Sequence, residues 1–433
     1  MQSWFSSLKA YFKKNLLLIF PLGLLAGIPY GMMVDPLNFW LSKSGVDRST
    51  IGLLSLVFVL YSFKALWAPF VDRLQIPILK VIGQRKSWLL LSHVFILFFL
   101  VSIGQSDPNS NLNWLVYFVI GLAFFSATQD ICVDALRIEM VEERELGQSA
   151  AVYQMGWRVG GVWISQVLGL LIGGIIGYSY AYTYVALIFL ALSLFVFFFI
   201  HEPKREIRPY ISLHEKPLTW LYDSFIYPIL DLYERYRKDL FLILSLIFIY
   251  RLSDMYLGPM AMPFYQEVGF TEVEVALVTN AFGTFVTISG ALIGGLLVHK
   301  WGLNINIFYG ALLTALTNLP FVYLNYIGNE LWFLWITIGL DNFTQGYVGV
   351  ITITFISSVI SRSFTATQYA LLVMLGTLPS RIIGSSSGYY VNSFGYHDFF
   401  IFAAALGIPA IILSYIVLRK RIVFSSNTGL KTD

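Results

Sequence analysis

Twelve runs of apolar residues, each long enough to cross a lipid bilayer, follow one another along the chain and are separated by shorter polar segments. A transmembrane helix needs about 20 predominantly apolar residues, and Pro and Gly inside such helices are tolerated. The pattern therefore predicts an all-α membrane protein of 12 transmembrane helices. The expected spans lie near residues 15–40, 48–71, 87–104, 112–136, 147–173, 180–200, 240–265, 273–298, 304–325, 331–357, 367–391 and 397–418.

The longest polar stretch, residues 201–239, divides these spans into two groups of six. It predicts an N-terminal half at 1–200, a cytosolic central loop at 201–239, and a C-terminal half with a short tail at 240–433. Within the loop, residues 218–237 form an amphipathic pattern. Two interpretations stay open for this segment, which is either a helix lying on the inner leaflet or a regulatory module.

The distribution of basic residues predicts the orientation. Most of the 28 Lys and Arg residues fall in loops on the side of the N-terminus, whereas Lys43 and Arg48 are the ones expected on the other side. Loops rich in Lys and Arg stay in the cytosol. Both termini are therefore expected there. The first apolar run is not followed by a small-residue cleavage site, so we expect it to serve as its own insertion signal.

Composition agrees with this class. Of the 433 residues, 57% are hydrophobic and 12% are charged, whereas soluble proteins carry about 25% charged residues. The net charge of +3 comes from loops and gives no reason to expect a nucleic-acid partner. With Cys132 as the single cysteine, neither a disulfide nor a cysteine-based zinc site is possible. We expect no cofactor or metal, and a monomer in the lipid bilayer.

The two halves carry weak internal repeats. The segment at 39–55 is similar to that at 264–279, and WRVGG at 157–161 is similar to SRIIG at 380–384. Arg158 thereby corresponds to Arg381, and the two repeats are separated by nearly the same number of residues. Six-span halves that repeat in parallel are typical of the major facilitator architecture. The sequence thus predicts two pseudo-symmetric six-helix halves.

The segment FFSATQDICVDALR at 124–137 carries polar groups into the fourth span. Asp130, Asp134 and Arg137 share one helix face because they are spaced four and three residues apart. A carboxylate at membrane depth is costly and persists only where it is paired, hydrated or used. Asp130 is therefore a candidate for proton coupling, with a static ion pair as the alternative. Asp134, Asp254 and Asp341 are further proton-coupling candidates.

The loop after the second span reads WAPFVDRL at 67–74 and then GQRKSW at 83–88. This order of Asp, Arg, Gly and basic residues resembles the cytosolic gate motif of major facilitators. Asp72, Arg73 and Arg85 are gate candidates, and Arg85 is expected to reach acids below the fourth span. Arg137 is expected to belong to the same network. The alternative is that these charges only orient the loop.

Four cations lie inside predicted spans, namely Lys64, Arg158, Arg251 and Arg381. An arginine cannot lose its charge, so each needs a carboxylate, a hydrated cavity or an anionic ligand. Counted against three deep acids, the cations leave one positive charge, which favours an anionic substrate. Arg158 and Arg381 either bind that substrate or pair with Asp130 and Asp341. A local pair of Arg251 with Asp254 is also open.

Neutral polar side chains complete the candidate binding residues. Gln129, Asn342 and Gln345 lie in spans and suit sugar hydroxyls and amides. Interhelical hydrogen bonds are the alternative use of such side chains in membranes.

Several motifs resemble the AmpG-type muropeptide permeases. They are SATQDICVDALR at 126–137, WAPFVDR at 67–73, GWRVG at 156–160 and RSFTATQYALL at 362–372. The resemblance covers both halves. It implies proton-coupled import of N-acetylglucosaminyl-anhydro-muramyl peptides from the periplasm across a bacterial inner membrane, for peptidoglycan recycling. The chain departs from the family in having Trp157 where Tyr is frequent, and Asp341 where Glu is frequent.

Two other function classes are weighed against this expectation. The ATQDI and VDA segments are also similar to the acetyl-CoA transporter group, so another bulky anion, such as acetyl-CoA or a folate-like acid, is the alternative substrate. A membrane enzyme or a scaffold is the third class. The loops are short and carry no HExxH, GxSxG or Walker motif, so we expect a secondary transporter and not an enzyme.

Overall fold

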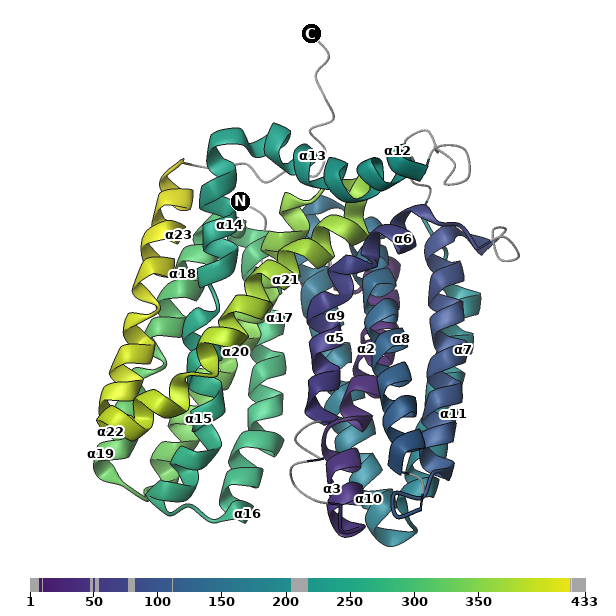
Figure 1. Ribbon diagram of the computed structural model, residues 1–433. Coiled ribbons are helices and arrows are strands. Elements are labelled where there is room, and N and C mark those ends of the chain that lie inside the picture. Colours follow the sequence, from purple (N-terminus) through teal and green to yellow (C-terminus); the bar gives the residue numbers. More distant parts are fainter. Residues whose placement is uncertain are drawn as a thin grey trace.

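The computed structural model describes residues 8–9, 11–46, 50, 54–76, 82–110, 112–203, 217–420 and 422. Every regular element in these ranges is a helix, and the helices form two bundles that stand side by side (Figure 1). The N-terminal bundle contains α2 (Lys14–Met32), α3 (Asp35–Lys43), η1 (Ser55–Phe58), α5 (Val59–Phe63), η2 (Lys64–Leu66), α6 (Ala68–Arg73), α7 (Gln84–Gln105), α8 (Leu112–Glu139), η4 (Glu143–Glu145), α9 (Leu146–Arg158), η5 (Val159–Val167), α10 (Leu168–Ile175) and α11 (Tyr178–Phe199).

A short helical segment, α12 (Pro217–Leu221), η6 (Tyr222–Ile226), α13 (Tyr227–Tyr236) and η7 (Arg237–Asp239), connects the bundles. The C-terminal bundle contains α14 (Leu240–Ile249), α15 (Leu252–Val268), α16 (Glu272–Val275), η8 (Ala276–Phe282), α17 (Gly283–Trp301), α18 (Leu303–Leu316), α19 (Leu319–Ile327), α20 (Leu331–Val359), η9 (Arg362–Phe364), α21 (Thr365–Gly384), α22 (Ser387–Ala405) and α23 (Ile408–Lys420).

Helices occupy the place of each of the twelve expected spans. In the part of the chain that the structure describes, nine helical stretches are long and apolar enough to cross a membrane, or ten when the bent pair α20–α21 is counted as one span. The second expected span falls short because it is described as the pieces η1 to α6, and residues 48–49 and 51–53 of that prediction lie outside the described residues. The eleventh ends earlier than expected, at Gly384.

We call the side where α2 begins and α23 ends the terminal face. The segment α12–α13 lies across this face, above α6 and α21 (Figure 1). On the opposite side lie α3, α10, α16 and α19. At the terminal face, α20 and α21 meet at an angle of 101°, so the start of α21 turns toward the N-terminal bundle.

Close backbone contacts reproduce the repeat that the sequence predicts. A Cβ atom on Gly27 of α2 would lie 2.3 Å from the carbonyl oxygen of Trp157, so α2 packs directly on α9 and η5. In the other bundle, a Cβ atom on Gly384 of α21 would lie 2.5 Å from the carbonyl oxygen of Met255 in α15. Small residues at such positions let membrane helices approach. The two bundles therefore use corresponding helix pairs.

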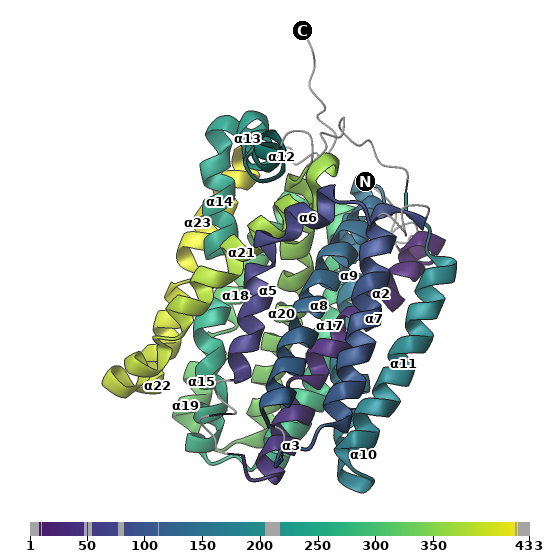
Figure 2. The ribbon, with the colours of Figure 1, turned by 45° about the vertical axis from the view of Figure 1, so that its right-hand side comes forward.

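The two bundles are joined by segments near the terminal face. The Tyr11 hydroxyl donates to the Leu292 carbonyl at 2.6 Å, and Arg362 donates to the Val141 carbonyl at 3.0 Å. Helices α9 and α17 also pack against each other, and α21 packs on both α6 and α8 (Figure 2). These contacts close the terminal face of the molecule.

Candidate functional site

Lys64 is the first of the buried charges that the structure brings together. Its ammonium group lies 3.2 Å from a carboxylate oxygen of Asp134 and 3.8 Å from one of Asp130. The three side chains are 7–14% exposed. One ammonium therefore neutralises one of two buried carboxylates, and the group as a whole keeps a negative charge.

Gln129 directly precedes Asp130 in the sequence, but its side chain makes a different contact. Its amide donates to the carbonyl oxygen of Leu25 at 2.8 Å, and its side chain is fully buried. That carbonyl lacks its helical partner because Pro29, four residues later, has no N–H to donate. The contact favours the interhelical alternative for Gln129 over direct substrate binding.

Asp72 and Arg85 form a buried cluster at the terminal face. Arg85 donates to Asp72 at 2.5 Å and to Glu139, at the end of α8, at 3.2 Å. The expected contact with an acid below the fourth span is therefore present. Asp72 also accepts hydrogen bonds from Thr367 at the start of α21, 2.6 Å from its backbone nitrogen. The cluster thus joins the two bundles.

Arg73 points toward the connecting segment and toward the other bundle. It donates to the carbonyl of Asp223 at 3.2 Å and lies 5.3 Å from the centre of the Phe364 ring. Its neighbours therefore differ from those of Asp72, although the two residues are adjacent in the sequence.

Arg137 is fully buried between two tyrosine rings. Its guanidinium carbon lies 5.7 Å from the ring centres of both Tyr153 and Tyr369, and it donates to the Ser357 hydroxyl at 3.0 Å. Among the described residues, no carboxylate lies within ion-pair distance of it. Because Ser357 and Tyr369 belong to the C-terminal bundle, Arg137 bridges the bundles by cation–π contacts.

Arginines from both bundles converge on Tyr30 in the interior. Tyr30 lies within electrostatic range of Arg158, Arg381 and Asp130, and Arg158 lies within range of Arg251. Neither Arg158 nor Arg381 forms an ion pair with a described residue. The expected alternative, in which they pair with Asp130 and Asp341, is therefore not what the structure contains.

Aromatic rings surround the same point. The ring centre of Tyr30 lies 4.8 Å from that of Phe58, 5.3 Å from Tyr61 and 5.4 Å from Trp157. The Arg158 guanidinium lies 5.9 Å from the Trp157 ring centre. Flat aromatic faces and positive charges that form no ion pair with a described residue thus occur together around Tyr30, and we call this place the Tyr30 site.

Each of the three arginines lies at an irregularity of its span. Arg158 ends α9 where a π-helical stretch begins, Arg251 sits in the break between α14 and α15, and Arg381 follows Pro379 inside α21. Interrupted membrane helices free backbone groups and mark binding sites in transporters. Sequence reasoning predicted the arginines and noted Pro379, but it did not predict the π-helical stretch after Arg158 or the break at Arg251.

The C-terminal bundle has two largely buried acids, Asp254 and Asp341, and only Asp254 has a cationic neighbour among the described residues. Arg251 lies 4.0 Å from Asp254, as the local-pair alternative expected. Asp341 is 7% exposed and accepts a hydrogen bond from Gln345 at 2.7 Å, and no described cation lies within ion-pair distance of it. Asn342 accepts from Thr287 at 3.0 Å and so connects α20 to α17.

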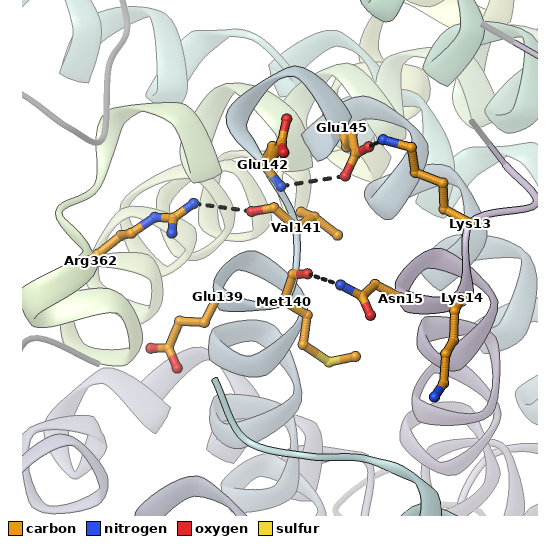
Figure 3. A pocket seen from close by; sticks show the side chains of 9 residues that line it. All are labelled: Lys13, Lys14, Asn15, Glu139, Met140, Val141, Glu142, Glu145 and Arg362. Carbon is orange, nitrogen blue, oxygen red and sulfur yellow. Dashed lines mark hydrogen bonds and ion pairs between the residues drawn. The ribbon is translucent and has the colours of Figure 1, made fainter. Parts of the chain in front are cut away.

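A pocket of about 470 Å³ lies at the terminal face, where α2, the end of α8 and Arg362 meet (Figure 3). An ion pair between Lys13 and Glu145 crosses its rim, and Asn15 donates to the Met140 carbonyl at 3.0 Å. The hydrogen bond to Glu145 raises the pKa of Lys13. The pocket is separate from the Tyr30 site and holds mixed charges.

Sequence reasoning missed several residues that the structure places in these clusters. They are Tyr30, Tyr61, Glu139, Ser357 and Thr367. Thr367 belongs to the FTATQ motif, and its place three residues into a helix is a signal for an acidic partner, because backbone N–H groups at helix starts are unpaired.

Comparisons with known proteins agree with this architecture. The sequence model of the family "Major Facilitator Superfamily" matches residues 17–385 of this chain. "Putative transporter AmpG 4" of Rickettsia felis is 30% identical over 402 residues, which cover 93% of this chain and 96% of the relative. "Putative transporter AmpG 3" of Rickettsia prowazekii is 29% identical over 420 residues, covering 96% and 99%.

Two solved structures share the fold. The proton:xylose symporter XylE, bound to 6-bromo-6-deoxy-D-glucose, superposes with a TM-score of 0.68 at 11% identity, covering 96% of this chain and 97% of that one. The human organic anion transporter MFSD10 gives a TM-score of 0.68 at 16% identity, covering 93% and 99%. The chain therefore belongs to the Major Facilitator Superfamily, with the twelve-helix fold of that superfamily, and within it to the AmpG-like transporters.

Proposed function

We propose that this protein imports cell-wall muropeptides, N-acetylglucosaminyl-anhydro-muramyl peptides, from the periplasm to the cytosol for peptidoglycan recycling, coupled to protons. The observation that carries the proposal is the convergence of Arg158 and Arg381 on Tyr30, one from each bundle and neither paired with a carboxylate of the described residues. The names of the AmpG relatives support it. The membrane is then a bacterial inner membrane.

The site suits the chemistry of such a ligand. Arginine binds carboxylates through two parallel hydrogen bonds, and the peptide part of a muropeptide carries several carboxylates. The rings of Tyr30, Tyr61 and Trp157 offer flat faces to the sugar rings. An arginine at membrane depth is costly unless an anion or water compensates it, so a bound anionic ligand would stabilise Arg158 and Arg381.

We assign the coupling proton to Asp130 first. Lys64 lies closer to Asp134 than to Asp130, so Asp130 is the carboxylate that the lysine compensates less. A proton on Asp130 removes the excess negative charge of the group. Asp341 is the second candidate, since it is buried beside Gln345 and no described cation lies within ion-pair distance of it.

The terminal face is assigned to the cytosol, and the Asp72 cluster and Arg137 to a gate that closes it. Lys and Arg residues gather on this face, as cytosolic loops require. Asp72 and Arg137 each bond across the bundles, to Thr367 and to Ser357. Opening toward the cytosol breaks both contacts. The structure is then a state closed on the cytosolic side.

Uptake into vesicles tests the proposal. Purified protein is reconstituted into proteoliposomes, and uptake of radiolabelled anhydro-muropeptide is followed with and without an imposed pH gradient. We expect accumulation that needs the gradient. Competition with acetyl-CoA and with a folate-like acid distinguishes the alternative substrates. Equal competition by those anions, or no accumulation under a gradient, contradicts muropeptide import.

A further inference from the structure

The segment that connects the two bundles touches both sides of the closed terminal face. We call residues Pro217–Tyr236, which comprise α12, η6 and α13, the linker helix. One face of it is buried at every fourth position, at Trp220, Ser224, Pro228 and Leu232. This period places the four residues on one side of a helix, turned toward the bundles.

On the N-terminal bundle, the linker helix holds the loop that carries Asp72. The Phe70 ring centre lies 5.6 Å from that of Trp220 and 5.8 Å from that of Phe225. Arg73 donates to the Asp223 carbonyl at 3.2 Å. The residues on both sides of Asp72 in α6 are therefore fixed to the linker helix.

On the C-terminal bundle, the linker helix holds the start of α21. Gln368, adjacent to Thr367 and fully buried, donates to the Pro228 carbonyl and to Asp231, both at 2.8 Å. Arg235 donates to Gln368 at 3.2 Å and to the Val359 carbonyl at 2.8 Å. The two residues that meet across the bundles, Asp72 and Thr367, are thus each flanked by linker contacts.

The exposed side of the linker helix is mainly apolar, although Thr219 and Glu234 are exposed there as well. It carries Leu218, Leu221, Tyr222, Ile226, Ile229 and Tyr233, which are 45–81% exposed. A continuous apolar face on an amphipathic helix lies in the interface of a membrane. We call these six residues the apolar stripe.

The residues next to the apolar stripe indicate that lipid covers it. The linker helix passes through Arg237 and Lys238, both exposed, directly into the membrane-spanning stretch that begins at α14, where Phe241 is 81% exposed. Apolar side chains at one membrane level, with exposed basic residues beside them, match acyl chains and anionic headgroups. A protein partner would have to compete with the bilayer for this position.

We propose that the linker helix is a membrane-anchored latch on the gate. Its apolar stripe lies in the lipid interface at the terminal face, and its buried face holds Asp72 and the start of α21 together. Opening the terminal face separates α6 from α21, so it requires the linker helix to release one of the two. This proposal rests on the gate assigned above, and it concerns how readily the gate opens.

Depth measurements by electron paramagnetic resonance test the anchor. Nitroxide labels are placed singly at Ile226→Cys, Ile229→Cys and, as the matched control on the same helix, Glu234→Cys, in a Cys132→Ala background. In vesicles of phosphatidylethanolamine and phosphatidylglycerol, we expect oxygen to relax the labels at 226 and 229 more than a water-soluble nickel complex does, and the reverse at 234. Water-like values at 226 and 229, or shielding from both reagents as a protein partner would give, overturn the anchor.

Distance measurements test the latch. Labels at Lys14→Cys and Arg419→Cys, exposed at the terminal face on opposite bundles, report its opening without substrate. We expect the double variant Trp220→Ala, Arg235→Gln to increase the fraction of molecules in which the two labels lie farther apart. The variant Glu234→Gln is expected to leave this fraction unchanged. Ile226→Ser with Ile229→Ser, which removes no contact within the bundles, is expected to shift it in the same direction.

Unchanged distances in both double variants overturn the latch. If Trp220→Ala prevents folding, the double variant Ile226→Ser, Ile229→Ser still tests the latch. Because neither measurement uses a transported substrate, a failed muropeptide uptake assay leaves both results valid, so this proposal and the proposed function fail separately.

Discussion

Asp72 and Thr367 are joined by two hydrogen bonds across the bundles. The backbone N–H and the hydroxyl of Thr367 donate to the same carboxylate oxygen of Asp72, at 2.6 Å and 2.5 Å. Thr367 lies in the first turn of α21, where the unpaired N–H groups and the helix dipole stabilise a negative charge. The second oxygen of Asp72 accepts from Arg85 at 2.5 Å. One carboxylate therefore neutralises an arginine of its own bundle and caps a helix of the other.

This relationship predicts a rate defect for Asp72→Ala. The change leaves the helix start without its anion, so we expect the state closed at the terminal face to lose stability and the maximal transport rate to fall. Substrate affinity is expected to change little because Asp72 lies outside the Tyr30 site. Removing one member of a buried ion pair costs about 3–5 kcal/mol, so thermal stability in detergent falls as well. Initial rates and equilibrium binding measure the two effects.

Thr367 supplies matched variants for the same prediction. Thr367→Ser keeps both donors and is expected to behave like the unmodified protein, whereas Thr367→Val keeps only the backbone N–H and is expected to show a milder rate defect than Asp72→Ala. An unchanged maximal rate in Asp72→Ala counts against the gate assignment.

Asp130 is predicted to carry proton coupling. Asp130→Asn removes the carboxylate that lies 3.8 Å from Lys64 and leaves the closer partner Asp134 in place. We expect the variant to lose accumulation driven by a pH gradient and to keep exchange of substrate between the two sides. Counterflow and gradient-driven uptake in the same proteoliposomes separate the two activities.

Asp134→Asn is the contrasting variant. It removes the main partner of Lys64 and leaves a buried ammonium with one distant carboxylate, so we expect lower folding yield as well as lost transport. Full accumulation by Asp130→Asn would end the assignment of the coupling proton to that residue.

Gln129 and Pro29 are predicted to be coupled in stability. Gln129→Leu leaves the Leu25 carbonyl without a donor, which costs about 1–3 kcal/mol for a buried polar group. Pro29→Ala supplies an N–H four residues after that carbonyl, and we expect it to restore part of the loss in the double variant. Thermal unfolding of the two single variants and the double variant in detergent gives the coupling. Additive losses would show that the Leu25 carbonyl is not shared between the two residues.

Much of the fold follows from the sequence because each membrane span is a long, local signal. The apolar runs, the polar stretch at 201–239 and the Arg158–Arg381 repeat were enough to predict the superfamily fold. Helix ends and breaks were not predictable in the same way. Arg251 sits in a break between two apolar helices, and the surrounding residues form a continuous hydrophobic run that hides it.

The partners of the buried charges were predicted for one local pair and for the loop that resembles a gate motif. The Arg251–Asp254 contact is local, and Arg85 was expected to reach below the fourth span. Arg137 was expected in a network of charges, yet it lies between the rings of Tyr153 and Tyr369. Tyr369 belongs to the other bundle, and no spacing along one chain indicates which residues two packed bundles bring together.

Arg158 and Arg381 are predicted to bind the substrate. They occupy matching repeat positions, and both lie within electrostatic range of Tyr30 without a carboxylate partner among the described residues. We propose that the two arginines bind two carboxylates of one elongated ligand. Arg→Lys at either position keeps the charge but loses the paired, planar hydrogen bonds. A hydrogen bond to a charged group contributes about 1.5–3 kcal/mol, so we expect affinity to fall about tenfold or more.

Measurements of folding distinguish a loss of ligand binding from a structural defect. Since neither arginine takes part in an ion pair of the described protein, Arg158→Lys and Arg381→Lys are expected to give normal yield and a single monodisperse peak in detergent. Arg419→Lys is the matched control, because Arg419 contacts Tyr415 at the end of α23, outside the Tyr30 site and the linker helix, and its substitution is expected to leave affinity unchanged. Well-folded Arg158→Lys and Arg381→Lys proteins that bind muropeptide with unaltered affinity would rule out the assignment of these arginines to the ligand.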